Sequence, residues 1–68
     1  MKLKNCVVGQ RVQVKLKQDV GSGIFYSDLQ GECGTILYIK DEPYNINVKF
    51  DNGREDSGSH NNLRKIKE

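Results

Sequence analysis

The residue types that carry most enzyme chemistry are scarce in this 68-residue chain. His60 is the single histidine. It sits among Ser59, Asn61 and Asn62, with no placed nucleophile or acid beside it. In such a polar stretch, a histidine that caps a turn or faces solvent is the simpler interpretation. His60 alone therefore does not indicate catalysis.

Metal and phosphate motifs are also missing from the sequence. Cys6, Cys33 and His60 lack the CxxC or HxxxH spacing of metal sites. The acidic residues near residues 51–56 lack the twelve-residue spacing of an EF-hand loop. Gly21-Ser22-Gly23 is not followed by the lysine and helix of a phosphate-binding loop. We therefore expect no metal, no cofactor and no enzymatic activity.

The charges are unevenly distributed, although the net charge is only +2. Residues 1–17 hold five Lys and Arg with no acid, residues 18–63 hold eight acids against three cations, and the end of the chain is basic again. If the two ends meet in space, they form one cationic face suited to phosphates. The candidates for nucleic-acid binding are Arg11, Lys15, Lys17, Arg64, Lys65 and Lys67. The alternative is a solvated edge strand, kept cationic to prevent edge-to-edge pairing.

Residues 18–31 contain three glycines and no sustained hydrophobic period, which predicts a long loop. Its large apolar residues are more than a solvated loop needs. One interpretation is that Ile24 and Leu29 tuck beneath the loop and plug one end of the core. The other is that Phe25 and Tyr26 present a contact surface. Both interpretations hold if one of the two rings packs inward and the other forms the contact surface.

A further aromatic side chain lies in a predicted turn. Proline fixes φ and removes a donor in Asp41-Glu42-Pro43-Tyr44, which makes this segment a turn. Aromatic anchors flanked by charge are typical of protein interfaces. The candidate protein-binding residues are Phe25, Tyr26 and Tyr44.

Two segments alternate apolar and polar residues with the period of a half-buried β-strand. The expected inward residues are Val12, Val14 and Leu16 in the first, and Ile46, Val48 and Phe50 in the second, which spans residues 45–50. Residues 32–39 predict another strand that is apolar on both faces and therefore strongly bent. Gly34 within it indicates a bulge or a close backbone approach.

The last third of the chain is predicted from its turns. Asn52-Gly53 favours a type I′ hairpin, so we expect a short exposed strand over residues 54–59, although this segment holds no large apolar side chain. Residues 60–63 have the character of a single 3₁₀ turn. Residues 64–67 then predict a fifth strand. The last inward residues are Leu63 and Ile66.

This order of elements resembles that of the SH3-like small barrels, from Val8 to Ile66. The motifs that carry the likeness are Gly9-x-x-Val12-x-Val14, Gly34-Thr35-Ile36, Val48-x-Phe50-Asp51-x-Gly53 and Leu63-x-x-Ile66. KOW and Tudor-type barrels look like this, as does, more distantly, the photosystem I subunit IV type of accessory barrel. The resemblance implies an all-β, five-stranded SH3-like small barrel with a long first loop and a 3₁₀ turn before the last strand. We expect one domain over residues 1–68, with its core at about residues 8–67.

The resemblance and the surface residues together predict a small non-enzymatic binding module. The favoured function is that of a protein-interaction, regulatory or accessory subunit that docks on a larger protein. The alternative is a KOW-like nucleic-acid-binding barrel that uses a basic face from its first and last strands. The acidic middle of the chain favours the protein partner, because it repels a phosphate backbone. A Tudor-type aromatic cage is not expected, since the chain has no Trp and Phe50 belongs to the core.

Segment composition gives the expected compartment. No apolar stretch approaches the roughly 20 residues that cross a bilayer, and residues 1–9 lack the apolar core of a secretion signal. We therefore expect a cytoplasmic protein without membrane contact, and a monomer. In a reducing compartment, the two cysteines are expected to be free, partly buried thiols.

Overall fold

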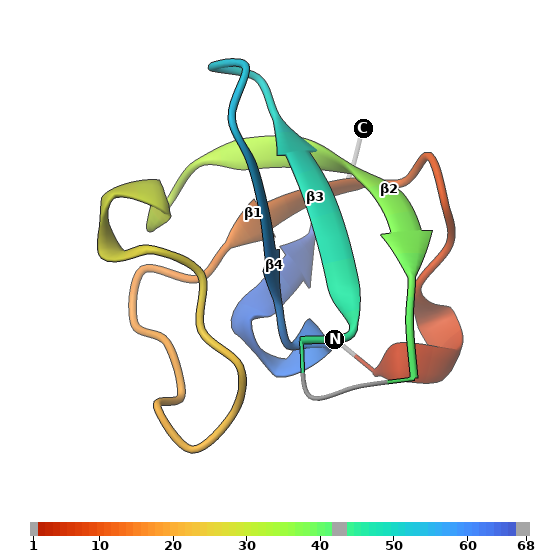
Figure 1. The fold of residues 1–68 in the computed structure, drawn as a ribbon, viewed down its shortest axis with the longest axis horizontal. Helices are drawn as coiled ribbons and strands as arrows, with labels where there is room; N and C mark the ends of the chain where they lie inside the picture. Colours follow the sequence, from red (N-terminus) through yellow and green to blue (C-terminus); the bar gives the residue numbers. More distant parts are fainter. Residues whose placement is uncertain (1, 42–43, 67–68) are drawn as a thin grey trace.

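The computed structural model describes residues 2–41 and 44–66 and shows an all-β fold. Five antiparallel strands form one sheet in the order β4-β3-β2-β1-β5 (Figure 1). The strands are β1 (Arg11–Val14), β2 (Cys33–Ile39), β3 (Ile46–Phe50), β4 (Glu55–Gly58) and β5 (Leu63–Lys65), and the 3₁₀ turns are η1 (Leu3–Asn5), η2 (Ser27–Leu29) and η3 (His60–Asn62). The predicted all-β class, the five strands and the 3₁₀ turn before the last strand are confirmed. Glu42 and Pro43 of the predicted turn, and the candidate Lys67, lie outside the described residues.

The central strand β2 pairs with β1 on one side and β3 on the other. A Cβ atom on Gly34 would lie 2.6 Å from both the carbonyl oxygen of Lys49 and Cγ1 of Val48, which confirms the predicted close backbone approach. The irregularity of the strand lies further along, where the register shifts between Ile36 and Tyr38. Glycine at position 34 thus lets two strands approach, and the shift at residues 36–38 bends the sheet.

The core is formed by the inward faces of the strands together with side chains from the loops. Its buried apolar residues are Cys6, Val12, Val14, Phe25, Leu29, Ile36, Ile46, Val48, Phe50 and Leu63. The rings of Phe25 and Phe50 pack edge to face, with centroids 5.9 Å apart and an interplanar angle of 85°. A Cβ atom on Gly58 would lie 2.4 Å from the Phe25 ring, so only glycine leaves room for that ring.

The prediction that Leu16 points inward is wrong, since its exposed fraction is 78%. The strand β1 ends at Val14, whose N–H donates to the Glu32 carbonyl and whose carbonyl accepts from the Gly31 N–H. These two bonds close the base of the long loop, so Leu16 already belongs to the loop. Ile66, the other predicted inward residue at an end of the pattern, follows β5 and is half-buried.

The hairpin between β3 and β4 is confirmed, but its predicted type I′ turn is wrong. Phe50 N–H donates to the Arg54 carbonyl at 2.7 Å, and Gly53 N–H donates to the Phe50 carbonyl at 3.0 Å. This is a three-residue loop with glycine at its last position, where φ is +92°. A type I′ turn needs positive φ at two residues, and no residue other than glycine has positive φ in the described ranges.

Candidate protein-binding groove

The long loop between β1 and β2 divides its aromatic pair between the core and the surface. Phe25 is fully buried, whereas the exposed fractions of Ile24 and Tyr26 are 43% and 65%. Phe25 therefore belongs to the core, and Tyr26 is the exposed ring of the pair. The prediction that Ile24 tucks inward is wrong, and Leu29 is buried as predicted. Neighbouring side chains in an extended segment point to opposite sides, so placing Phe25 on Gly58 turns both its neighbours outward.

Two side-chain amides fix the shape of this loop, which projects at one side of the molecule (orange to yellow in Figure 1). Gln18 Nε2 donates to the Phe25 carbonyl at 2.9 Å, and Phe25 N–H donates to Gln18 Oε1 at 2.8 Å. Fully buried Asn62 accepts from Asp19 N–H at 2.7 Å and donates to the Gly23 carbonyl at 2.8 Å. Gln18 thus braces the loop internally, and the buried amide of Asn62 holds the loop to η3.

The same loop runs beside β4, the strand at one edge of the sheet. Ser59 N–H donates to the Gly23 carbonyl at 2.7 Å. The Asp56 carboxylate accepts from the backbone N–H of Tyr26 and of Ser57, both at 2.9 Å. The loop therefore covers the edge strand β4, and the Asp56 carboxylate is bonded to backbone N–H groups of both the loop and β4.

Between the loop and β4 lies a groove of about 570 Å³. Its lining residues are Ile24, Phe25, Tyr26, Ser27, Tyr44, Asp56 and Ser57. Tyr44, with an exposed fraction of 52%, comes from the segment between β2 and β3, and Tyr26 comes from the long loop. All three predicted protein-binding residues thus line one hollow, which we call the tyrosine groove, although only Tyr26 and Tyr44 are exposed.

Tyr26 is further held by Arg54, which follows the β3–β4 turn. The guanidinium carbon of Arg54 lies 5.7 Å from the centroid of the Tyr26 ring. The same guanidinium forms an ion pair with Asp28 on η2. A planar cation over an aromatic face restricts the ring's rotation. The tyrosine that faces the groove therefore has few conformations to lose when a ligand binds.

A second hollow, of about 450 Å³, adjoins the groove through Tyr44 and is lined by polar residues. His60 and Asn45 bond to each other twice there. His60 N–H donates to Asn45 Oδ1 at 3.0 Å, and Asn45 Nδ2 lies 2.9 Å from His60 Nδ1. The amide group is a donor, so Nδ1 is the acceptor and the ring is used to fix the start of η3. His60 is thus half-buried and part of a turn.

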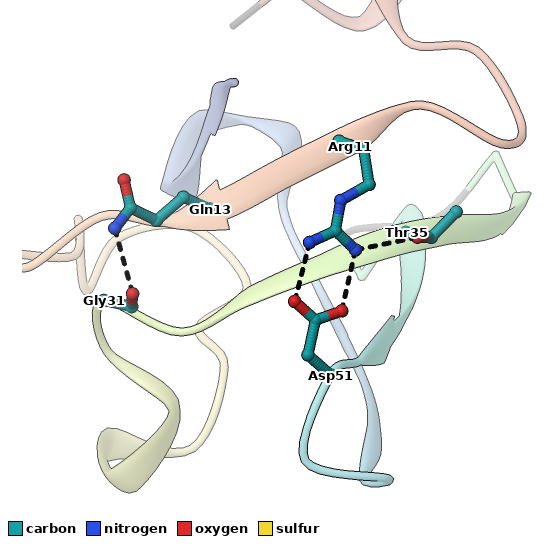
Figure 2. Close-up of polar contacts among 5 residues, drawn as sticks. All are labelled: Arg11, Gln13, Gly31, Thr35 and Asp51. Carbon is teal, nitrogen blue, oxygen red and sulfur yellow. Dashed lines mark hydrogen bonds and ion pairs between the residues drawn. The ribbon is translucent and has the colours of Figure 1, made fainter. Parts of the chain in front are cut away.

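Arg11, a candidate for nucleic-acid binding, forms hydrogen bonds to other residues of the fold, as Figure 2 shows. Its guanidinium donates to both carboxylate oxygens of Asp51, at 2.7 and 2.6 Å, and to Thr35 Oγ1 at 3.1 Å. The hydrogen bond and the positive charge of Arg11 hold the pKa of Asp51 below its usual value. Arg11 therefore ties β1 to the β3–β4 turn.

Three of the other basic candidates, Lys15, Arg64 and Lys65, lie at or beside the pairing of β1 with β5. β1 pairs with β5, with Gln13 opposite Arg64 and Val12 opposite Lys65. Lys15 continues this pairing, since its N–H donates to the Asn62 carbonyl at 2.9 Å. The sequence left open whether the basic ends are neighbours, and the strand pairing places them side by side.

Other site types find little support in the ranges 2–41 and 44–66. No group of three His, Cys, Asp or Glu side chains there is placed to hold a metal ion. No helix in that part of the chain is long and apolar enough to cross a membrane. Cys6 is buried, which raises the pKa of its thiol, and Cys33 is half-buried. Neither thiol is bonded to the other.

No protein-family model, no curated protein and no solved structure matches this chain. Its function is therefore argued from the geometry of its own surfaces.

Sequence reasoning missed four lining residues of the tyrosine groove: Ile24, Ser27, Asp56 and Ser57. A signal for Ile24 exists, because it stands two residues before Tyr26 and alternation places both on one side. No local signal marks Asp56. Its position in the groove depends on the contact between the loop and β4, which are far apart in the sequence.

Proposed function

We propose that this chain is a non-enzymatic protein-interaction module, an SH3-like barrel that binds a segment of a larger protein in the tyrosine groove. One observation carries the proposal: Tyr26 and Tyr44, from two different loops, are both more than half exposed and border one hollow. The barrel architecture is supported by the strand order, the long first loop and the 3₁₀ turn before β5.

The exposed aromatic side chains have no role in the core. Ile24, Tyr26 and Tyr44 lie outside the buried cluster, so folding does not require their apolar surface. Aromatic residues in a partly enclosed hollow are frequent anchors of protein interfaces. The loop that carries Ile24 and Tyr26 is held in place by the hydrogen bonds of Gln18 and Asn62. A preorganised groove loses less conformational entropy on binding.

The charge beside the groove indicates the chemistry of the bound segment. Asp56 is half-buried, and no Lys or Arg within the described residues forms an ion pair with it. Its oxygens accept backbone N–H bonds, and its negative charge has no ion-pair partner among residues 2–41 and 44–66. An apolar side chain between the tyrosines with a Lys or Arg beside it complements such a groove. We infer that the partner presents a short extended segment of this kind.

Selection from a randomised library of twelve-residue peptides tests this function. The wild-type protein should enrich peptides that pair an apolar or aromatic residue with a cation. The double variant Tyr26→Ser/Tyr44→Ser should lose at least 10-fold in affinity for the enriched peptides, while its fold is unchanged. Truncating an anchor residue costs about 2 kcal/mol or more, which is a factor of about 30.

Tyr38→Ser is the matched control. Tyr38 is a similarly exposed tyrosine on β2 that stacks under Lys40 and lines neither hollow. This variant should bind the enriched peptides as the wild type does. Equal binding by wild type and double variant, or equal losses in the double variant and the control, contradicts the proposed function.

A further inference from the structure

Several cations near the pairing of β1 with β5 form no ion pair with an acidic side chain of the described residues. The described chain contains two ion pairs, Arg11–Asp51 and Arg54–Asp28. The four cations near the β1–β5 pairing that take part in neither are Lys15, Lys17, Arg64 and Lys65, which we call the basic edge. Three of them are exposed, and Lys15 is half-buried.

Two residues of the basic edge line a hollow of their own. Gln13, Arg64, Lys65 and Ile66 line a depression of about 440 Å³. Gln13 and Arg64 are directly opposite in the strand pairing, so their side chains share a face of the sheet. Lys15 directly follows β1, and its N–H bond to the Asn62 carbonyl holds it next to the start of β5. Two cations thus line one shallow site, and Lys15 and Lys17 follow at the start of the long loop.

Protection of a sheet edge does not account for this set. A lysine on an outer strand prevents pairing with another molecule, which suits Lys65 on β5. Lys15 is different, since it lies on no strand and its N–H is already bonded to the Asn62 carbonyl. Lys17 also lies outside every strand. Like charges on neighbouring segments repel one another, so a ligand that neutralises them is favoured.

We propose that the basic edge binds the phosphate backbone of double-helical nucleic acid without sequence preference. Strong binding of single strands depends on aromatic side chains that stack on the bases. None of the described aromatics lines the basic hollow: Phe25 and Phe50 are buried, Tyr26 and Tyr44 line the tyrosine groove, and Tyr38 is on β2. A site of cations and one amide contacts phosphates and carries no direct readout of bases.

This surface is independent of the proposed protein-binding function. The basic hollow and the tyrosine groove share no lining residue. They are built on strands at opposite ends of the sheet order, β5 with β1 and β4. One molecule can therefore hold a peptide segment and a nucleic acid together, and loss of one activity leaves the other measurable.

Fluorescence anisotropy with labelled 20-base-pair duplexes of DNA and of RNA tests the proposal. With four phosphate contacts on DNA, the logarithm of the association constant should fall with the logarithm of salt with a slope of about −3.6. This slope corresponds to a loss on the order of 100-fold between 50 and 200 mM salt. Two DNA duplexes of unrelated sequence should bind within about 2-fold of each other, and a single strand should not bind more tightly than a duplex.

The variant Lys15→Gln/Lys17→Gln/Arg64→Gln/Lys65→Gln should lose at least 10-fold in affinity at 50 mM salt. The matched control Lys2→Gln/Lys4→Gln/Lys40→Gln/Lys49→Gln removes as many charges elsewhere and should lose less than 3-fold. The single variant Arg64→Gln should lower the magnitude of the DNA salt slope by about 1, which keeps the test valid if the fourfold variant unfolds.

Three results overturn the proposal. The first is no anisotropy change with either duplex at 50 mM salt. The second is an equal loss in the control, which makes binding a matter of net charge. The third is a loss in Tyr26→Ser/Tyr44→Ser, which moves the nucleic acid to the tyrosine groove. Peptide selection by that groove is measured separately, so failure here leaves the proposed function standing.

Discussion

The long loop at residues 15–32 and the hairpin of β3 and β4 use aromatic side chains in different ways. In the hairpin, strict alternation sends Ile46, Val48 and Phe50 inward, and the two backbone bonds that close the turn are local. In the loop, one aromatic residue completes the core and the next borders the tyrosine groove, and the fastening bonds come from distant residues. The hairpin supplies buried apolar residues, whereas the loop connects the core to the proposed binding surface. Substitutions in the two regions should therefore differ in kind.

The largest difference is expected within the loop itself, between neighbouring residues. Phe25→Ala removes a fully buried ring and should lower the free energy of unfolding by about 3–5 kcal/mol. Tyr26→Ala removes an exposed ring and should change it by about 0.5 kcal/mol or less. Urea denaturation followed by circular dichroism measures both. Similar losses for the two variants contradict the assignment of one ring to the core and one to the surface.

The next effect concerns the buried amide that fastens the loop. Asn62→Ala leaves the Asp19 N–H and the Gly23 carbonyl without their side-chain partner, and should lower the free energy of unfolding by about 1–3 kcal/mol. Hydrogen exchange should accelerate most at residues 19–26. Asn61→Ala is the control, because exposed Asn61 makes only a 3.3 Å side-chain bond to Ser22. Uniform acceleration over the hairpin as well contradicts a local fastening role.

A glycine substitution compares the hairpin with the loop directly. Gly53→Ala places a Cβ at φ +92° and should lower the free energy of unfolding by about 1–2 kcal/mol. Gly21→Ala, at an exposed loop position without positive φ, should change it by less than about 0.5 kcal/mol. Thermal unfolding of the two variants tests this. The reverse order contradicts the three-residue turn with glycine in the left-handed region.

The smallest expected effect is the pH dependence of stability that comes from the Arg11–Asp51 ion pair between the hairpin and β1. The pKa of Asp51 is lower in the folded protein than the usual value of about 3.9, so its contribution is present above that value. That contribution is lost as the pH falls through the folded pKa. Asp51→Asn should therefore flatten the decline in unfolding free energy below about pH 4. If the unfolding free energy of Asp51→Asn declines at low pH as steeply as that of the wild type, the proposed role of the Arg11–Asp51 pair is contradicted.

The sequence predicts the hairpin well and the loop poorly for a physical reason. Alternation and the glycine turn are local signals, so β3, its partner β4 and the turn η3 can be expected from the chain alone. The turn type cannot, since Asn-Gly fits both a two-residue and a three-residue loop. Leu16 shows the limit of alternation. The apolar period of Val12 and Val14 continues to Leu16, although β1 ends at Val14, where the hydrogen bonds to Gly31 and Glu32 close the base of the loop.

The binding surfaces are predicted only in part. Tyr26, Tyr44 and the basic residues are visible by type, and their grouping follows from strand pairing. The burial of Phe25 is difficult to predict, because its packing partner Gly58 has no side chain and gives no hydrophobic signal in the sequence. The space for the Phe25 ring exists only where the long loop and β4, which are distant in the sequence, come together in the fold.

The most direct test of the account is an amide chemical-shift titration of ¹⁵N-labelled protein with a peptide enriched by selection. The account predicts that the largest shifts occur at Ile24, Tyr26, Tyr44 and Asp56, with little change at Arg64 and Lys65. Largest shifts at the basic edge, or shifts spread evenly over the sheet, contradict the central claim that the loop and β4 form the protein-binding surface.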